Sequence, residues 1–592
     1  MRKKVRTYLW LVMFLLSLIL AIAQVTPYHL KLLAVQETDG GYQGSGADLY
    51  LELKEGSGRV FLETTPVTKM DTQISTRFAK EIACNHFKLD CSKHDFIFTI
   101  KAESNIIGGP SAGAAIAALT TIAVLDLDYS QDIAITGTVN SGGIIGPVGG
   151  LKEKMQAAAE SKLTTVLIAS GSANYTITEN ETINLIEYGK KNLSMEVIEV
   201  VDLDEVLYHL TGVDLNHKEV VVIQDANYQK IMEQLKDVLC ARNDKIEMEI
   251  EERGIRLEED IVDAVASKKS HAFNASSGGD YYSAASFCFS NNLQLKAYYY
   301  EQEELSDARY ISLFEIVVRK AELLEQQLDA EVIDTISDLQ TLIVVRERLH
   351  DVKEQIRKFN ETFSVSTPKE KANLLAYAEE RFFSAISWQQ FFAMDGKKFV
   401  VDREQLKHSC QQKIAEAEER FNYVGIFLGE LRILNVQEKI DIAQTSLDSA
   451  EYELCLIEAA QAKADSNAIL SSLGLDEGTV APYLESKQKA VERVISENSA
   501  EDIFPILGYS YYQYANSLKQ TDPFTALVYF EYALEMSDLG IYFPTKESFL
   551  ERKDIVQVRK EWGYAVGGIV IGIVVGFLLG KWKKGRKGRR KG

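Results

Sequence analysis

Alternating hydrophobic and polar positions dominate the first third of the chain. They predict short strands over residues 48–53, 59–63, 95–100, 132–136 and 164–168, with a helix over 72–83. Strands and helices that alternate in this way are typical of a mixed domain. We therefore expect an α+β domain over residues 24–215.

The pattern changes at about residue 220 to long stretches rich in Glu, Lys, Leu and Ala with helical spacing. Thr367 with Glu370 predicts a capped helix start. An aromatic-x-Ala-x-x-aromatic pattern begins at Tyr282, Phe383 and Phe524, at near-multiples of about 34 to 36 residues, the tetratricopeptide period. We expect an all-α domain of tetratricopeptide-like helical hairpins over 216–560, with an irregular helical bundle as the alternative.

Both ends of the chain carry membrane signals. Residues 1–23 combine a basic start with an apolar run and predict a signal peptide or signal anchor. Residues 563–580 are uncharged and long enough for a transmembrane helix, and the tail 581–592 holds eight basic residues. The positive-inside rule predicts a cell-membrane protein with residues 24–562 extracytoplasmic and the tail cytoplasmic.

Small residues recur on one face of the predicted transmembrane helix, at Gly568, Gly572, Gly576 and Gly580. Such a stripe lets a second helix approach closely and favours a homo-oligomer. The alternative is that glycine is simply common in membrane helices.

Composition narrows the function classes. The formal net charge of -21 opposes nucleic acid binding, because an acidic surface repels phosphates. Six cysteines suit a compartment that tolerates disulfides, and Cys84 with Cys91 is the expected pair. A zinc site of these cysteines with His86 and His94 is the alternative, but its spacing is atypical, so we predict no metal.

The first chemical motif surrounds Ser111. Glycines and a proline precede this serine, and an Ala-rich helix follows it. Backbone around Gly109, Pro110 and Ala112 is expected to approach a substrate, and unpaired amides at a helix start can stabilise an oxyanion. Ser111 is then a candidate nucleophile, with a helix N-cap as the alternative role.

The second motif surrounds Lys154. Leu151, Lys154, Met155 and Ala158 share one face of a predicted helix. A desolvated lysine favours its neutral form and can accept a proton from a hydroxyl group. The alternative is that Lys154 extends its ammonium to the surface.

Together the two motifs resemble the proteolytic domain of the Lon family over residues 28–215. Ser111 and Lys154 lie 43 residues apart, as in the bacterial members. The resemblance implies a Ser-Lys catalytic dyad, in which Thr136 hydrogen-bonds the lysine. Gly108 and Thr138 replace acidic residues that are usual in the family.

The chain also departs from Lon in its nucleotide chemistry, because no Gly-x-x-x-x-Gly-Lys-Ser/Thr motif occurs in the sequence. This layout resembles the membrane-tethered Lon-like proteases of archaea that lack the ATPase. It implies a serine endopeptidase that uses neither ATP nor another cofactor and cleaves flexible or unfolded extracytoplasmic polypeptides.

Two other functions remain open at this point. GHMP small-molecule kinases share this type of α+β fold and hold ATP with a Gly-Ser-Ser-Ala loop, although such a kinase would leave Lys154 and Thr136 without a role. A catalytically silent peptidase fold could instead serve as a scaffold that binds partners through the helical domain.

Overall fold

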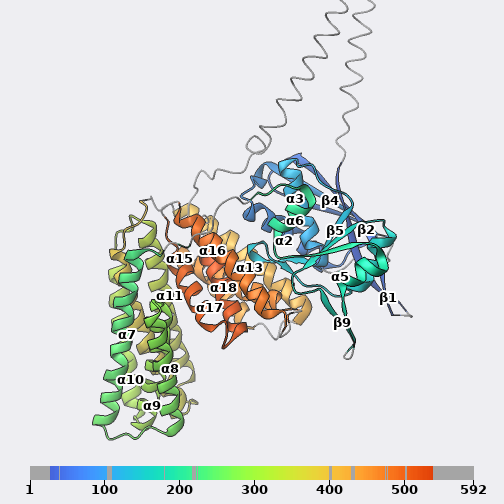
Figure 1. Ribbon diagram of the computed structural model, residues 1–592. Coiled ribbons are helices and arrows are strands. Elements are labelled where there is room, and N and C mark those ends of the chain that lie inside the picture. The colour runs from blue at the N-terminus through green and yellow to red at the C-terminus, as the bar shows by residue number, and fades with distance from the viewer. Residues whose placement is uncertain are drawn as a thin grey trace, which may run out of the picture.

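The computed structural model describes residues 27–38, 41–102, 110–178, 181–215, 222, 224–398, 403–428, 434–473, 475, 478–500 and 503–537. Within these residues, an α+β domain (27–215) packs against an all-α region (224–537). Figure 1 shows the first in blue to teal and the second in green to red.

One four-stranded sheet opens the α+β domain, with the strand order β1-β2-β4-β3. The strands are β1 (Tyr28–Thr38), β2 (Gly41–Glu55), β3 (Val60–Thr65) and β4 (His94–Ala102). Neighbours β1, β2 and β4 pair antiparallel, whereas β3 runs parallel to β4. Burial alternates along β3, because only one face of this strand meets the core.

A second, parallel sheet has the order β11-β8-β5 and contains β5 (Ile133–Thr136), β8 (Thr165–Ala169) and β11 (Glu196–Val200). Every residue of β8 is buried, as expected of a central parallel strand covered on both faces. Two short hairpins join β6 (Thr138–Val139) to β7 (Ile145–Gly146) and β9 (Asn174–Thr178) to β10 (Glu181–Asn184).

Helices complete this domain: α2 (Met70–His86), α3 (Gly113–Leu125), α4 (Leu151–Glu160), α5 (Leu185–Tyr188) and α6 (Leu203–Thr211). Helix α3 is buried on nearly all sides, between α2, α6 and strands of both sheets. Its small Ala and Gly side chains suit this crowded position. The predicted α+β fold is confirmed.

The all-α region contains α7 (Ala226–Glu252), α8 (Glu259–Ser277), α9 (Tyr281–Gln302), α10 (Asp307–Asp329), α11 (Ile336–Thr362), α12 (Pro368–Trp388), α13 (Arg403–Leu428), α14 (Leu434–Asp448), α15 (Tyr452–Ser472), α16 (Val480–Ser499), α17 (Ile506–Leu518) and α18 (Pro523–Ser537). Thr367 and Glu370 form the predicted capping box at the start of α12. The helical character of this region is therefore confirmed.

These helices do not form a regular tetratricopeptide array. Hairpin α11–α12 alone spans residues 336–388, well beyond a repeat of about 34 residues. Helix α9 contacts α7, α8 and α12, so these elements pack as an irregular bundle. Tyr282 and Trp388, from two copies of the aromatic pattern, pack edge to face with ring centroids 6.2 Å apart. Tyr282 and Trp388 therefore serve core packing within a bundle, whereas Phe524, which begins the third copy of the pattern, is 55% exposed.

Helices α13, α15, α16 and α18 lie between this bundle and the α+β domain (Figure 1). The short turn Ser141–Gly143 of the α+β domain fits against α16 and α18. Gly142 has a φ of 75°, and a Cβ there would lie 2.8 Å from Ala490 Cβ, so this close approach requires glycine. The two parts of the molecule consequently share a tightly packed interface.

In the part of the chain that the structure describes, no helix has the length and apolar character needed to cross a membrane. The predicted signal segment (1–23), the transmembrane helix (563–580) with its glycine stripe, and the basic tail (581–592) lie outside the described residues.

Candidate active site

Ser111 lies in a single 3₁₀ turn, Pro110–Ala112, which leads directly into α3. Two backbone hydrogen bonds tie this turn to the end of β5. The Gly137 amide donates to the Ser111 carbonyl over 3.1 Å, and the Ala114 amide donates to the Gly137 carbonyl over 3.1 Å. A Cβ at Gly113 would lie 3.1 Å from the Val139 backbone nitrogen, so the turn sits close against β6.

The N-cap alternative for Ser111 is wrong. The residue at the N-cap of α3 is Ala112, and no side chain caps this helix. The Ser111 hydroxyl therefore does not cap the start of α3. It faces a cavity instead.

Lys154 lies in the first turn of α4, as its predicted helix face requires. Gly150 precedes the helix with a φ of 67°, and a Cβ there would lie 2.6 Å from Val35 Cγ2. Leu151, Met155 and Ala158 on the same face are buried in a core that also holds residues of β1, β5, β8 and β11. Because Lys154 lies on this face of α4, its side chain is also buried.

Lys154 does not extend its ammonium to the surface, because only 4% of the residue is exposed. Among the described residues, its Nζ has no carboxylate or hydrogen-bond partner. Burial lowers the pKa of Lys154 from its ordinary value near 10.5 to about 8. A substantial fraction of the amine is thus neutral near physiological pH and able to accept a proton.

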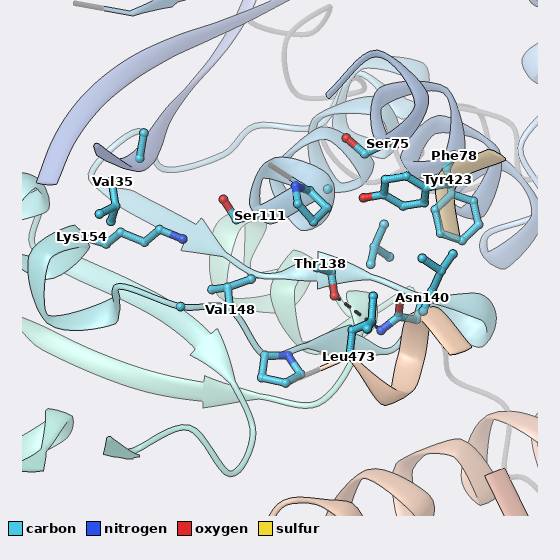
Figure 2. Close-up of a pocket in the computed structure, with 17 residues that line it drawn as sticks. Val35, Ser75, Phe78, Ser111, Thr138, Asn140, Val148, Lys154, Tyr423 and Leu473 are labelled. Atoms are coloured by element: carbon cyan, nitrogen blue, oxygen red, sulfur yellow. Dashed lines mark hydrogen bonds between the residues drawn. The ribbon is translucent and has the colours of Figure 1, made fainter. Parts of the chain in front are cut away.

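One cavity of about 390 Å³ brings the two residues together, and both Ser111 and Lys154 line it. Figure 2 shows the Lys154 side chain extending toward Ser111 from across the cavity. No hydrogen bond joins them in the described structure. Such bonds are commonly long in free enzymes and tighten when substrate binds.

Thr136, the residue predicted to hold the lysine, is buried at the end of β5, directly before Gly137. Its Oγ1 atom has no hydrogen-bond partner within the described part of the chain. The bond from Thr136 to Lys154 therefore stays a prediction.

The residues predicted to form the oxyanion site divide into two groups. Gly109 lies outside the described residues, as does Gly108. Pro110 and Ala112 flank the nucleophile in its turn. Pro110 has no amide hydrogen, so it shapes the turn and cannot itself donate a hydrogen bond.

Thr138, which stands where an acidic residue is usual in Lon, lines the cavity beside Asn140. The Asn140 amide donates to the Thr138 hydroxyl over 3.5 Å and to the Tyr483 hydroxyl of α16 over 3.1 Å. Sequence reasoning did not single out Asn140, because its partner lies 343 positions away along the chain.

The helical region also reaches the cavity, through Tyr423, Leu470 and Leu473. These residues were likewise absent from the sequence prediction, since they carry no motif and come to the site only through the packing of α13 and α15.

Cys84 and Cys91 form a disulfide, as do Cys240 with Cys288 and Cys410 with Cys455. The zinc alternative for Cys84, His86, Cys91 and His94 is therefore wrong, because a disulfide sulfur is not the thiolate that zinc binds. His86 instead lies 2.7 Å from an Asp204 carboxylate oxygen, and Arg493 of α16 donates to its Nδ1 over 2.8 Å.

Comparison with known proteins gives the family of this site. Residues 78–212 match the model of the Lon protease (S16) C-terminal proteolytic domain. This segment contains the Ser111 turn, Thr136 and the Lys154 helix.

The similar proteins are Lon proteases of bacteria. The chain is 32% identical to the Lon protease of Paraburkholderia phytofirmans over 123 residues, which is 20% of this chain and 15% of that protein. It is 36% identical to that of Azorhizobium caulinodans over 101 residues, 17% of this chain and 11% of that protein. It is 29% identical to the Lon protease of Fervidobacterium nodosum over 127 residues, which is 21% of this chain and 16% of that protein.

The similarity thus covers only 11% to 16% of the length of these relatives. The family model falls on the segment that holds Ser111 and Lys154. The fold, the motifs and the sequence match agree with one another. Residues 78–212 of this chain belong to the Lon (S16) proteolytic domain family.

Proposed function

We propose that this chain is a membrane-anchored, ATP-independent serine endopeptidase, with Ser111 as nucleophile and Lys154 as general base. The observation that carries the proposal is the meeting of Ser111 and a buried Lys154, which has no partner among the described residues, at one cavity. This pair lies within the segment that matches Lon proteolytic domains.

The chemistry follows from the protonation of Lys154. Its neutral amine accepts the Ser111 hydroxyl proton while Oγ attacks the substrate carbonyl carbon. The resulting ammonium then protonates the departing amine, leaving an acyl group on Ser111. Water then attacks this ester while the neutral Lys154 accepts a proton from it. Lys154 returns the proton to Ser111 Oγ, and the carboxylic acid product leaves.

Backbone and hydroxyl groups support this sequence of steps. The Ala112 amide, beside Ser111 at the start of α3, is a suitable donor to the oxyanion. We assign Thr136 to orienting Lys154, because its buried hydroxyl has no other partner among the described residues. A buried unpaired hydroxyl costs about 1–3 kcal/mol, which a bond to the lysine would recover.

Three disulfides support an extracytoplasmic site of action, because the cytoplasm keeps most thiols reduced. The basic ends of the sequence support membrane attachment in that orientation. The absence of a phosphate-binding motif from the sequence supports independence from ATP. Flexible or unfolded polypeptides are then the proposed substrates, and the similarity to Lon proteases favours this function over a small-molecule kinase.

Casein cleavage by purified variants tests the proposal. Ser111→Ala should abolish cleavage, and Lys154→Ala should lower the rate by about 10²–10⁴-fold, the usual contribution of a general base. Lys152→Ala is the matched control, because this neighbouring lysine is only half-buried and does not line the cavity. Casein cleavage that survives both dyad substitutions would refute the proposed function and favour a scaffold.

A further inference from the structure

The cavity beside Ser111 is not enclosed by the proteolytic domain alone. Tyr423 of α13, Leu470 of α15 and Leu473, directly after α15, line the same cavity. In Figure 2, Tyr423 and Leu473 lie at the end away from Lys154, with Ser111 between the two ends. The helical region therefore supplies one wall of the space in which a substrate would lie.

This wall is held firmly against the proteolytic domain. The Arg420 guanidinium stacks 3.4 Å from the centroid of the Phe78 ring, and it donates to Glu81 of α2 over 3.1 Å. The Cys410–Cys455 disulfide joins the two helices that carry the wall. A binding surface that is fixed in advance loses little conformational entropy when a ligand enters.

This end of the cavity is mostly apolar, and its polar groups include the neutral side chains of Thr138 and Asn140 and the hydroxyl of Tyr423 (Figure 2). Phe78, Val139, Tyr423, Leu470 and Leu473 supply rings and aliphatic groups there. Among the described residues that line the cavity, none is acidic, and Lys154 at the opposite end is the one with a cationic side chain.

The polar groups that line the cavity near this end are neutral, and two of them already donate hydrogen bonds within the protein. The Asn140 amide donates to Tyr483, and the Ser75 hydroxyl donates to the Thr72 carbonyl. A charged substrate side chain would therefore lose its hydration at this end and meet no group of opposite charge among the described residues that line it.

We propose that Tyr423, Leu470 and Leu473 form, with Phe78, a substrate subsite that selects an apolar side chain next to the scissile bond. The all-α region is thus a specificity element of the protease and not only a spacer. This inference rests on the proposed function, since it assigns the cavity beside Ser111 to a polypeptide substrate.

Fluorogenic peptides that differ only in one residue beside the cleaved bond test the subsite. Two series, one for each side of the bond, carry Leu, Ala or Lys at that position. The full-length protein should prefer Leu to Lys by at least about 10-fold in kcat/KM in one series, because removing a charged side chain from water is unfavourable there.

Leu473→Asp places a carboxylate in the subsite and should reduce the Leu-to-Lys preference at least about 10-fold, or invert it. Leu323→Asp is the matched control, because Leu323 is 60% exposed on α10, within the bundle away from the cavity. It should leave the preference unchanged. Leu473→Ala is a second variant that only enlarges the site, and it should raise the rate for a Trp peptide relative to the Leu peptide.

Phosphonate labelling of Ser111 reports whether each variant is folded and active. Labelled Leu473 variants with unaltered preferences in both series would overturn the subsite while leaving the protease intact. A wild-type protein that neither labels nor cleaves would overturn the proposed function, and the subsite with it.

Discussion

Lys154 destabilises the fold at neutral pH. Burial lowers its pKa from near 10.5 to about 8, so the folded state binds this proton less tightly than the unfolded chain. Between about pH 8 and 10.5 the unfolded state holds more protons, and stability therefore rises with pH across this window. The difference corresponds to about 3 kcal/mol, a cost that is fully present below pH 8.

Replacing Lys154 by a neutral side chain of similar length should therefore stabilise the protein while removing its activity. We expect Lys154→Met to increase the free energy of unfolding by about 1–3 kcal/mol at pH 7, and by little at pH 10.5. Urea unfolding at the two pH values measures this, with Lys152→Met as control. A variant less stable than the wild type at pH 7 would show that Lys154 has a structural partner.

At the scale of single residues, the sequence predicted the parts of the site that local patterns encode. The glycine-rich turn indicated Ser111, and helical periodicity placed Lys154 on a buried face, where it lies. Tyr423 and Leu473 were not predictable in this way, because they reach the cavity from more than 300 positions beyond Ser111. No local pattern encodes a contact between two regions of that separation.

Among the elements, the turn Ser141–Gly143 is held by a buried ion pair from the helical region. Lys487 and Glu531 are each 0% exposed, with Nζ and Oε1 2.6 Å apart. Lys487 also donates to the Ser141 carbonyl over 2.9 Å, and the Ser141 hydroxyl donates to Glu531. The turn follows β6, whose Thr138 and Val139 line the cavity, so the pair steadies one side of the candidate site.

Removing one member of this ion pair should destabilise the protein more than removing both. Lys487→Met leaves Glu531 buried without its cation and should cost about 3–5 kcal/mol. The double variant Lys487→Met with Glu531→Leu leaves no isolated charge and should recover most of that loss. Denaturant midpoints of the three proteins test this, and a double variant no more stable than Lys487→Met would argue against the ion pair.

Element prediction succeeded where the pattern was local and failed where packing decided the outcome. The predicted strand over 95–100 and helix over 72–83 match β4 and α2. The 34-residue period did not predict the arrangement of the helices, since Tyr282 and Trp388 pack together in one bundle core. Strand β11 was not predicted, and its place is fixed by parallel pairing with β8.

For the whole molecule, the proposed function assigns substrate binding to a cavity at the junction of two regions, and the size of this cavity would limit the substrates. A space of about 390 Å³ admits an extended segment of chain and excludes a folded domain. We expect reduced, carboxymethylated α-lactalbumin to be cleaved and the native protein to resist. Addition of ATP with Mg²⁺ should leave both rates unchanged. Gel electrophoresis of the digests measures both rates. ATP-dependent cleavage of the native protein would contradict the proposed function.

The central claim is that a neutral Lys154 activates Ser111, and labelling by a serine-reactive phosphonate at different pH values tests it most directly. The account predicts one adduct, located on Ser111 by peptide mass spectrometry, that is absent from Ser111→Ala. Its rate of formation should rise about 50-fold from pH 6 to pH 8, as a base with a pKa of about 8 loses its proton. An adduct elsewhere, a rate that is flat from pH 6 to pH 9, or unchanged labelling in Lys154→Ala would contradict it.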